Sequence, residues 1–309
     1  MPKDLHELPK LRDSLSYLYI EHAIIEQEDS AIVVIRKDER IPVPIASMTV
    51  LLLGPGTSVT HAAIKAICDN GCMVVWCGER AMRFYAFGMG ETRSAVNLLK
   101  QAKLCMDQDK HLIVVRKMYQ LRFPNIKTDN MTLQQIRGLE GIRVRETYKQ
   151  LSKLHGVKWQ GRNYKSDSWD EADPLNRALS AGNACLYGLC NAAIVSLGYS
   201  AGLGFIHSGK MLSFVYDIAD LYKMQTTIPA AFEAVSSCGA ENIEKEARLR
   251  CRYYFKEQKV LKRVADDINF IFEIQDENID INSNIAGELW NGEDELVSGG
   301  KNYANLGEE

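Results

Sequence analysis

Residues 48–56 read Met48-Thr49-Val50-Leu51-Leu52-Leu53-Gly54-Pro55-Gly56. A short apolar run that stops at a Gly-Pro-Gly turn is typical of a buried β-strand. Runs of the same kind, rich in β-branched and aromatic residues, lie on either side of it at 14–20, 31–35, 73–76 and 82–86. We therefore expect residues 1–90 to form a β-rich N-terminal domain.

Helical patterns dominate the rest of the chain. One short helix is expected inside the β-rich part, from an N-cap at Thr60 to Cys68. After Gly88 and Gly90 the apolar residues recur with helical spacing, and helices are predicted at 94–123, 132–156, 173–198, 212–223, 229–235 and 241–273. The predicted fold class is α+β, an N-terminal β domain followed by a larger all-α domain over residues 91–275.

The charge of the chain is divided unevenly. From Asp276 onward there are nine acidic residues and one basic residue, Lys301, so this segment carries a net charge of −8. Because the whole chain of 309 residues carries −3, the body before it carries +5. A basic body is compatible with a phosphate-bearing ligand. The segment 276–309 lacks apolar periodicity, and we expect it to form an acidic, flexible tail.

The cysteines and the N-terminal sequence bear on the compartment. The eight cysteines show no spacing typical of a zinc site, so buried free thiols are favoured over metal binding. No signal-peptide pattern opens the sequence, and no apolar run reaches the roughly eighteen residues of a membrane span. The sequence predicts a cytoplasmic protein with no membrane partner.

Four side chains could carry out chemistry. Asp217 and Asp220 lie three apart in an apolar helical segment, which puts both carboxylates on one face. His207 lies just upstream in a glycine-containing loop that suggests the close approach of a ligand. Glu140 has a glycine on either side within a helix, which favours close helix packing or ligand approach. Two acids in an apolar segment are costly unless they meet a cation.

The spacing alone leaves structural alternatives open. An acid pair of this kind usually pairs with a basic neighbour, and a single histidine usually makes a structural hydrogen bond. Clusters of charge mark functional sites only statistically. From these residues alone, a metal site and a structural charge cluster both remain possible.

Two longer segments, 137–145 and 204–220, carry a family resemblance. Shorter motifs accompany them, among them Gly54-Pro55-Gly56-Thr57, Gln101-Ala102-Lys103-Leu104 and Val115-Arg116-Lys117-Met118. From about Leu11 to Glu273 the chain resembles the integrase of the CRISPR adaptation system. The similarity is closest to the subfamily found beside Cascade-type interference systems. The acidic tail lies outside the resemblance.

The resemblance implies a metal-dependent reaction on DNA. The helical domain would be catalytic, with Glu140, His207 and Asp220 as ligands of Mg²⁺ or Mn²⁺ and Asp217 behind them or as an auxiliary ligand. The metal would neutralise charge at the phosphorus and activate a 3′-hydroxyl, so that a short foreign DNA duplex (a prespacer) joins a CRISPR array by transesterification. One imidazole beside carboxylates leans the site toward Mn²⁺.

The resemblance also implies partners. They are double-stranded DNA with 3′ overhangs, CRISPR repeat DNA, a second copy of the chain, and a small partner subunit whose dimer two integrase dimers would flank. The residues expected to contact DNA are His22, Lys65, Arg83, Tyr164, Trp169, Tyr187, Lys210, Tyr216, Lys223, Arg248 and Arg252. For each charged residue the alternative is a solvated surface charge, and for Tyr187 it is core packing.

His22 departs from the family pattern. Close relatives carry a tyrosine there, which stacks on the last base pair of the captured duplex. A histidine would make a weaker wedge because its ring is smaller. The alternative is that His22 merely ends a strand.

Two other functions remain open at this point. Integration in reverse resembles the cutting of a branch, so one alternative is a structure-specific endonuclease acting on branched DNA. The other is a non-catalytic scaffold that only holds DNA.

Overall fold

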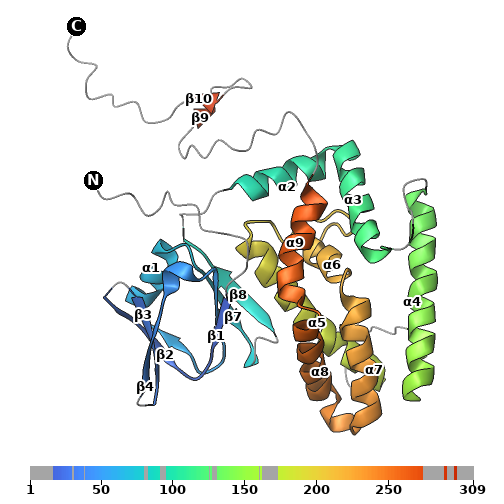
Figure 1. Ribbon diagram of the computed structural model, residues 1–309, viewed down its shortest axis with the longest axis horizontal. Helices are drawn as coiled ribbons and strands as arrows, with labels where there is room; N and C mark the ends of the chain where they lie inside the picture. Colours follow the sequence, from blue (N-terminus) through green and yellow to red (C-terminus); the bar gives the residue numbers. More distant parts are fainter. Residues whose placement is uncertain are drawn as a thin grey trace. The chain divides into compact units, whose positions relative to one another are not determined.

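The computed structural model describes residues 17–29, 31–37, 39–79, 83–90, 95–124, 126, 131–159, 161, 173–273, 289–290 and 296–297. The chain separates into two compact units, Met1–Ile274 and Gln275–Glu309. In the first unit, strands are followed by helices, which confirms the predicted fold class (Figure 1). The predicted boundary at residue 90 lies inside that unit and stays a prediction.

Two four-stranded sheets form the β-rich part (Figure 1). One has the order β1 (Tyr17–Ile20), β5 (Val50–Leu53), β7 (Met73–Cys77) and β8 (Phe84–Gly88), parallel except for β8. The other has the order β4 (Glu39–Val43), β3 (Ala31–Arg36), β2 (Ile24–Glu28) and β6 (Ser58–Val59), antiparallel except for β6. A short 3-10 turn, Ile45–Ser47, connects β4 to β5.

The segment that predicted the fold is the central strand β5. All four of its side chains are buried, and they alternate between two cores. Leu51 and Leu53 pack with the second sheet and the helix α1 (His61–Asp69), whereas Val50 and Leu52 pack with Val195 of the helical part. A strand buried on both faces reads as a continuous apolar run. The strands β2 and β4 were missed because they contain exposed charged residues.

Three helices begin at the caps that the sequence predicts. The Thr60 hydroxyl accepts a hydrogen bond from the Ala63 amide of α1 at 3.2 Å. A capping box between Thr132 and Gln135 starts α4 (Leu133–His155), which ends at Gly156 with a φ of 66°. Asp173 caps α5 (Pro174–Ser196). Each cap satisfies backbone donors that have no partner inside the helix.

Three helical predictions need correction. The segment 94–123 is two helices, α2 (Val96–Met106) and α3 (Gln108–Arg122), because the Asp107 carboxylate caps the second one. The segment 241–273 is also two helices, α8 (Ile243–Glu257) and α9 (Val260–Phe272), separated at Lys259, whose φ is +48°. The segment 212–223 contains the shorter α6 (Ser213–Ala219) and the start of a 3-10 turn, Lys223–Gln225. The remaining helix, α7, spans Thr227–Ser237, and a 3-10 turn, Ala240–Asn242, precedes α8.

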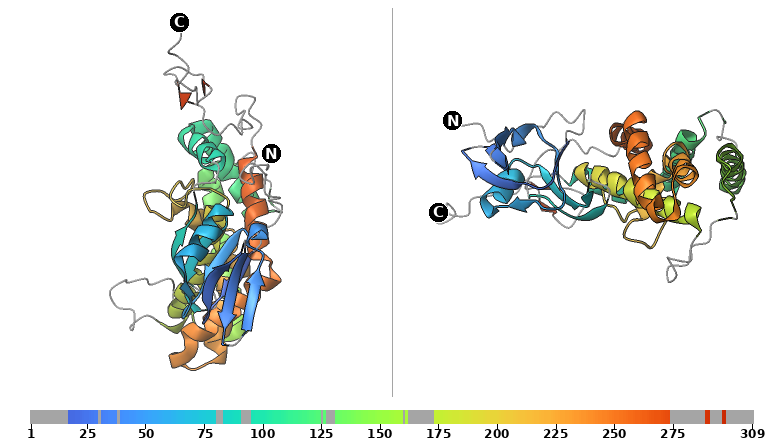
Figure 2. Two further views of the ribbon diagram at one scale, coloured as in Figure 1. Left: turned by 90° about the vertical axis from the view of Figure 1, so that its left-hand side faces the viewer. Right: turned by 90° about the horizontal axis from the view of Figure 1, so that it is seen from below.

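The helix α5 is the centre of the helical part. It packs against α6, α7, α8 and α9, and also against β8. Among the described helices, α5 is the one that is long and apolar enough to cross a membrane. The sequence did not predict this, because polar residues interrupt its apolar run. Most of it is buried inside the protein, as expected for a core helix. By contrast, α4 lies at the outside of the helices, with most of its residues exposed (Figures 1 and 2).

The second unit contains a short strand pair. Strand β9 (Leu289–Trp290) runs antiparallel to β10 (Leu296–Val297), a feature the sequence analysis did not predict. In the first unit, all eight cysteines have free thiols; five of them are buried, as predicted, whereas Cys68, Cys105 and Cys238 are only partly buried.

Candidate functional site

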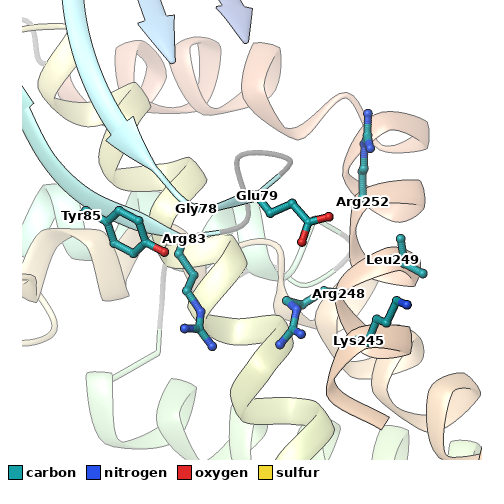
Figure 3. A pocket seen from close by; sticks show the side chains of 8 residues that line it. All are labelled: Gly78, Glu79, Arg83, Tyr85, Lys245, Arg248, Leu249 and Arg252. Carbon is teal, nitrogen blue, oxygen red and sulfur yellow. The ribbon is translucent and has the colours of Figure 1, made fainter. Parts of the chain in front are cut away.

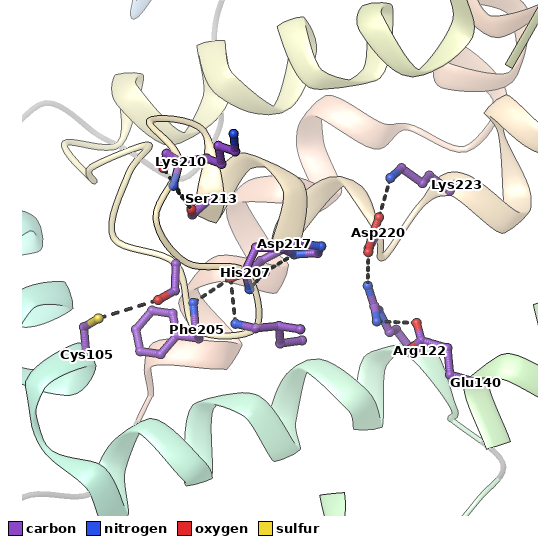
Figure 4. A network of polar contacts seen from close by, with 12 residues as sticks. Cys105, Arg122, Glu140, Phe205, His207, Lys210, Ser213, Asp217, Asp220 and Lys223 are labelled. Carbon is purple, nitrogen blue, oxygen red and sulfur yellow. Dashed lines mark hydrogen bonds and ion pairs between the residues drawn. The ribbon is translucent and has the colours of Figure 1, made fainter. Parts of the chain in front are cut away.

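Asp217 holds the loop that carries His207. This aspartate on α6 is fully buried, and it accepts hydrogen bonds from the backbone amides of Phe205 at 2.6 Å, Ile206 at 3.1 Å and His207 at 2.8 Å. It is also 2.7 Å from the Nδ1 atom of the His207 ring (Figure 4). Because this carboxylate accepts four hydrogen bonds, its role is to hold the loop and the His207 ring in place. With Nδ1 turned to Asp217, Nε2 is the nitrogen of His207 left for a metal ion or a substrate.

The same contact sets the proton affinity of His207. The hydrogen bond to Asp217 raises the pKa of His207 above its ordinary value, although partial burial acts in the opposite direction. The His207 side chain remains 42% exposed, so it is accessible from solvent.

The loop folds tightly because residue 204 is a glycine. A Cβ atom at Gly204 would lie 2.3 Å from the His207 carbonyl oxygen and 2.8 Å from the Cβ of Ser213. Gly209, at the other end of the loop, has a φ of +77°. The predicted tight loop is therefore confirmed, whereas the ligand beside it stays a prediction.

The second part of the site is a cluster of opposite charges. The Arg122 guanidinium at the end of α3 donates through Nη1 to the Glu140 carboxylate on α4, and its Nη2 lies 2.8 Å from Oδ2 of Asp220 (Figure 4). On the other side, Nζ of Lys223 lies 2.5 Å from Oδ1 of Asp220. The sequence left open that Asp217 and Asp220 pair with a basic neighbour instead of a metal ion. In the structure Asp220 does pair with basic neighbours.

The charges in this cluster support one another. Burial opposes ionisation of Asp220, but Lys223 and Arg122 outweigh it, so the pKa of Asp220 lies below its ordinary value. For Lys223 burial again acts against the charge, and Asp220 outweighs it and raises the pKa. Both groups are therefore charged at neutral pH.

The three predicted metal ligands are neighbours that do not meet at one point. Within the part of the chain that the structure describes, no three histidine, cysteine or acidic side chains gather as the ligands of one ion. Glu140 and Asp220 meet at Arg122, while His207 turns one nitrogen to Asp217. The donors are nevertheless those that Mg²⁺ and Mn²⁺ prefer, and the two carboxylates already hold a cation between them. By donor chemistry the residues fit a divalent ion.

The glycines beside Glu140 do not serve helix packing. Among the residues that the structure describes, no atom lies within 4 Å of a Cβ atom placed at Gly138 or Gly141. One of the two predicted reasons for these glycines is therefore wrong. The other, ligand approach, stays a prediction, and the face of α4 around Glu140 is open to it.

Arg122 was not predicted as a site residue from the sequence. Its side chain is almost fully buried, and it continues the buried face of α3 formed by Val115, Met118 and Tyr119. An arginine at such a helical spacing on an apolar face needs a buried partner of opposite charge. That signal was available in the sequence.

Several predicted DNA contacts lie beside this site. The Tyr187 and Tyr216 rings are 4.9 Å apart, and Tyr216 is 5.8 Å from the His207 ring. Lys223 lies over the Tyr187 ring at 4.9 Å. Lys210 is exposed in the His207 loop. Tyr187 is partly buried and packs against the helical core, so the alternative of core packing holds for part of its side chain.

Three other predicted DNA contacts line a basic pocket of about 510 Å³ between the β7–β8 connection and α8 (Figure 3). They are Arg83, Arg248 and Arg252. The sequence analysis did not include Lys245, a fourth cation in the lining. Arg250 turns away toward Glu233 and Glu246, as expected for an arginine on a different face of the helix.

The remaining predicted contacts are scattered. Lys65 is exposed on α1 and paired with Asp69 at 2.6 Å. His22 is an exposed residue between β1 and β2 with a φ of +50°, and its amide donates to the Pro55 carbonyl at 3.0 Å. It therefore follows the end of a strand, and its role as a wedge stays a prediction. Tyr164 and Trp169 lie outside the described residues.

Comparison with known proteins identifies the family. The sequence profile of the family described as CRISPR associated protein Cas1 matches residues 16–129 and 127–240. The chain belongs to the Cas1 family. It is 47% identical over 302 residues to a protein named CRISPR-associated endonuclease Cas1 2 from Thermus thermophilus, covering 96% of this chain and 93% of that relative. It is 41% identical over 275 residues to CRISPR-associated endonuclease Cas1 from Escherichia coli K12, covering 88% and 90%.

Solved structures of the Cas1 family show the same fold. A crystal structure described as a TtCas1–DNA complex superposes with a TM-score of 0.80 at 50% identity, covering 87% of this chain and 100% of that one. A casposase bound to an integration product has a TM-score of 0.51 at 14% identity, which shows a shared fold alone.

Proposed function

We propose that this Cas1-family chain is the metal-dependent integrase of CRISPR adaptation. It joins the 3′-hydroxyl ends of short foreign DNA duplexes to a CRISPR array by direct transesterification in the cytoplasm. One observation carries the proposal. The buried Asp217 holds His207 beside two carboxylates, Glu140 and Asp220, which both pair with the Arg122 guanidinium.

In this proposal each residue has a distinct task. Carboxylate oxygens of Glu140 and Asp220 and Nε2 of His207 would hold Mg²⁺ or Mn²⁺, whose positive charge stabilises the phosphorane transition state and lowers the pKa of the attacking hydroxyl. Asp217 orients His207 through Nδ1 and stays out of the ligand set, because its oxygens are already occupied. Lys223 keeps Asp220 ionised.

Binding of DNA has separate support. The pocket lined by Arg83, Arg248 and Arg252 gathers cations within one concave surface, as a phosphate backbone requires. Tyr187 and Tyr216 offer ring surfaces beside the catalytic residues, where bases can stack. A relative 50% identical to this chain is described as a DNA complex.

We extend the proposal to the assembly. By resemblance to the subfamily beside Cascade-type systems, two dimers of this chain flank a dimer of a small partner subunit, and the complex holds a duplex with 3′ overhangs against repeat DNA. His22, Lys65, Tyr164, Trp169 and Lys210 are the further proposed DNA contacts.

Two alternatives are kept. Relatives are named endonucleases, which favours a nuclease that cuts branched DNA. A scaffold that holds DNA without catalysis is the other alternative, and it is compatible with carboxylates paired to Arg122.

A strand-transfer assay separates the three functions. The protein and its small partner subunit are incubated with a short duplex and a supercoiled plasmid that carries a repeat, and in parallel with a branched DNA, each with EDTA, Mg²⁺ or Mn²⁺. Covalent joining that needs the metal supports the integrase. Cutting of branched DNA without joining supports the nuclease, and binding without either reaction supports the scaffold.

A further inference from the structure

Arg122 occupies the place between the two carboxylates that the proposed function assigns to a metal ion. Its guanidinium contacts Glu140 through one terminal nitrogen and Asp220 through the other (Figure 4). The three residues come from the end of α3, from α4 and from the end of α6. One buried cation therefore links three helices.

The guanidinium is not fully satisfied in this position. The Arg122 side chain is only 6% exposed, and its buried Nε atom has no hydrogen-bond partner among the described residues. A buried donor without a partner costs free energy, and native proteins contain few of them. The arrangement is thus one that a competing cation can displace at lower cost than a fully bonded arginine.

The turn of α4 that carries Glu140 is joined to α3 by the ion pair with Arg122 and by Arg143, which donates to the Arg122 carbonyl oxygen and lies over the Phe123 ring. The buried side chains of α4 are Ile136 and Tyr148, which lie on either side of this turn. Between them the directions from Gly138 and Gly141 are open. The ion pair with Arg122 is therefore one of the contacts that hold this turn, and it is the one that links Glu140 to Asp220.

We propose that Arg122 is an internal counter-ion that competes with the divalent metal for Glu140 and Asp220. In the metal-free protein it neutralises the two carboxylates and keeps α4 beside α6. Metal binding requires the guanidinium to leave, so part of the binding free energy is spent on breaking these ion pairs. The inference rests on the proposed metal-dependent function.

The sign of the effect separates this role from a supporting one. If Arg122 competes, its removal frees Glu140 and the Oδ2 atom of Asp220, whose Oδ1 atom still pairs with Lys223, and it withdraws a repelling charge, so metal affinity rises. If Arg122 instead holds the carboxylates in the geometry that a metal needs, its removal lowers metal affinity. Measurement of metal binding without DNA distinguishes the two.

The experiment measures Mn²⁺ binding to the full-length protein by calorimetry and by the electron paramagnetic resonance signal of free Mn²⁺. The variants are Arg122→Gln, Arg122→Lys and Glu140→Ala. The matched control is Arg177→Gln, which removes a partly buried arginine that pairs with Glu244 at 3.1 Å. We expect Arg122→Gln to bind Mn²⁺ about tenfold more tightly than the wild type, a coupling of ordinary size. Arg122→Lys, which keeps the charge but cannot bridge two carboxylates in the same way, should show a smaller increase, and Arg177→Gln none.

A second measurement does not depend on the Arg122→Gln variant folding. The Nε–Hε signal of Arg122 in the wild type, assigned by its loss in Arg122→Lys, should shift when Mg²⁺ is added, while the Arg177 signal stays. In EDTA, Arg122→Gln should melt at a lower temperature than the wild type, and Mn²⁺ should raise its melting temperature by more.

The outcomes separate this inference from the proposed function. Equal or weaker Mn²⁺ binding by Arg122→Gln, or an Arg122 signal that Mg²⁺ leaves in place, overturns the counter-ion role. In that case, wild-type binding that Glu140→Ala abolishes leaves the metal site standing. No Mn²⁺ binding by the wild type or by Arg122→Gln overturns both the counter-ion role and the metal dependence.

Discussion

At the residue scale, Asp217 and Asp220 show how two acids three positions apart acquire different tasks. Asp217 points at the folded-back loop and accepts its amides and the His207 ring. Asp220, at the end of the same helix, faces Arg122 and Lys223. The first therefore positions a functional group, while the second is itself a group that can bind a cation.

The first prediction concerns the pKa of His207. Because the hydrogen bond to Asp217 raises this pKa, Asp217→Asn should return it toward the ordinary value of about 6.5. The stability that comes from pairing protonated His207 with Asp217 is fully present below that ordinary value and is lost as the pH rises through the raised one, whereas the three amide hydrogen bonds to Asp217 remain. A titration of His207 by NMR in EDTA checks the shift, and the variant should lose about 10- to 100-fold in joining activity. Asp266→Asn, which removes an exposed acid on α9, is the control and should titrate like the wild type.

His111 supports the same loop from the other side. Its Nε2 lies 2.7 Å from the Phe205 carbonyl and its Nδ1 lies 3.1 Å from the Cys105 carbonyl. Both partners are backbone carbonyl oxygens, which only accept hydrogen bonds. His111 and Asp217 thus hold the carbonyl and the amide of the same residue, Phe205.

The second prediction is a graded loss at His111. His111→Gln retains one donor group and His111→Leu retains none, so stability should fall in that order by about 0.5–1.5 kcal/mol for each hydrogen bond lost. Urea unfolding measures the stability, and a joining assay should show the same order. An unchanged His111→Leu protein in both assays would remove His111 from this account.

The residues that can take part in chemistry could be recognised in the sequence, whereas the contacts that pair them with one another could not. Charges inside apolar segments indicated Asp217, Asp220 and His207. Which acid faces the loop and which faces a cation depends on the folding back of Gly204 and on Arg122 from an earlier helix. Both are tertiary contacts that local spacing does not contain.

At the scale of elements, the predicted helices differ from the observed ones mainly at the places where a helix is interrupted. Caps at Thr60, Thr132 and Asp173 could be predicted because each precedes a clear helical pattern. The cap at Asp107 was missed because helical spacing continues on both of its sides. The break lets α2 and α3 diverge, and α3 then delivers Arg122 to the site.

The third prediction tests the Asp107 cap. Asp107→Ala removes a carboxylate that accepts from the Asp109 and Lys110 amides at 3.0 and 3.1 Å. The free energy of unfolding should fall by about 1 kcal/mol, as is typical for an N-cap. Asp109→Ala, which removes an exposed acid in the first turn of α3 that caps no amide among the described residues, is the matched control and should cost less. Equal losses for the two variants would show that the carboxylate at 107 is not a cap.

At the scale of the whole molecule, the two units differ in composition. The first unit contains the cores and the candidate site, and the acidic second unit has two short paired strands among its described residues. The separation into units agrees with the change in charge at Asp276. The strand pair could not be predicted, because strands of two residues leave no periodicity.

The fourth prediction concerns removal of the second unit. A chain truncated after Ile274 should melt within about 2 °C of the full-length protein, since a segment without an apolar core of its own adds little to global stability. Capture of DNA or assembly with the small partner should weaken, because we propose that the apolar Trp290 and the Leu296–Val297 pair anchor this unit on a partner. Differential scanning calorimetry tests the first part, and an unfolded truncation product would make the second unit part of the main fold.

The central claim is that Glu140, His207 and Asp220 form one metal-dependent site for DNA joining. The most direct measurement is the joining of a labelled duplex to a supercoiled target in Mn²⁺ by Glu140→Ala, His207→Ala and Asp220→Ala, each with its duplex affinity and melting temperature recorded. Each variant should capture the duplex and remain folded, and should lose joining activity by a factor of about 100 or more. Near-normal joining by any one of the three in Mg²⁺ or Mn²⁺ would contradict the account.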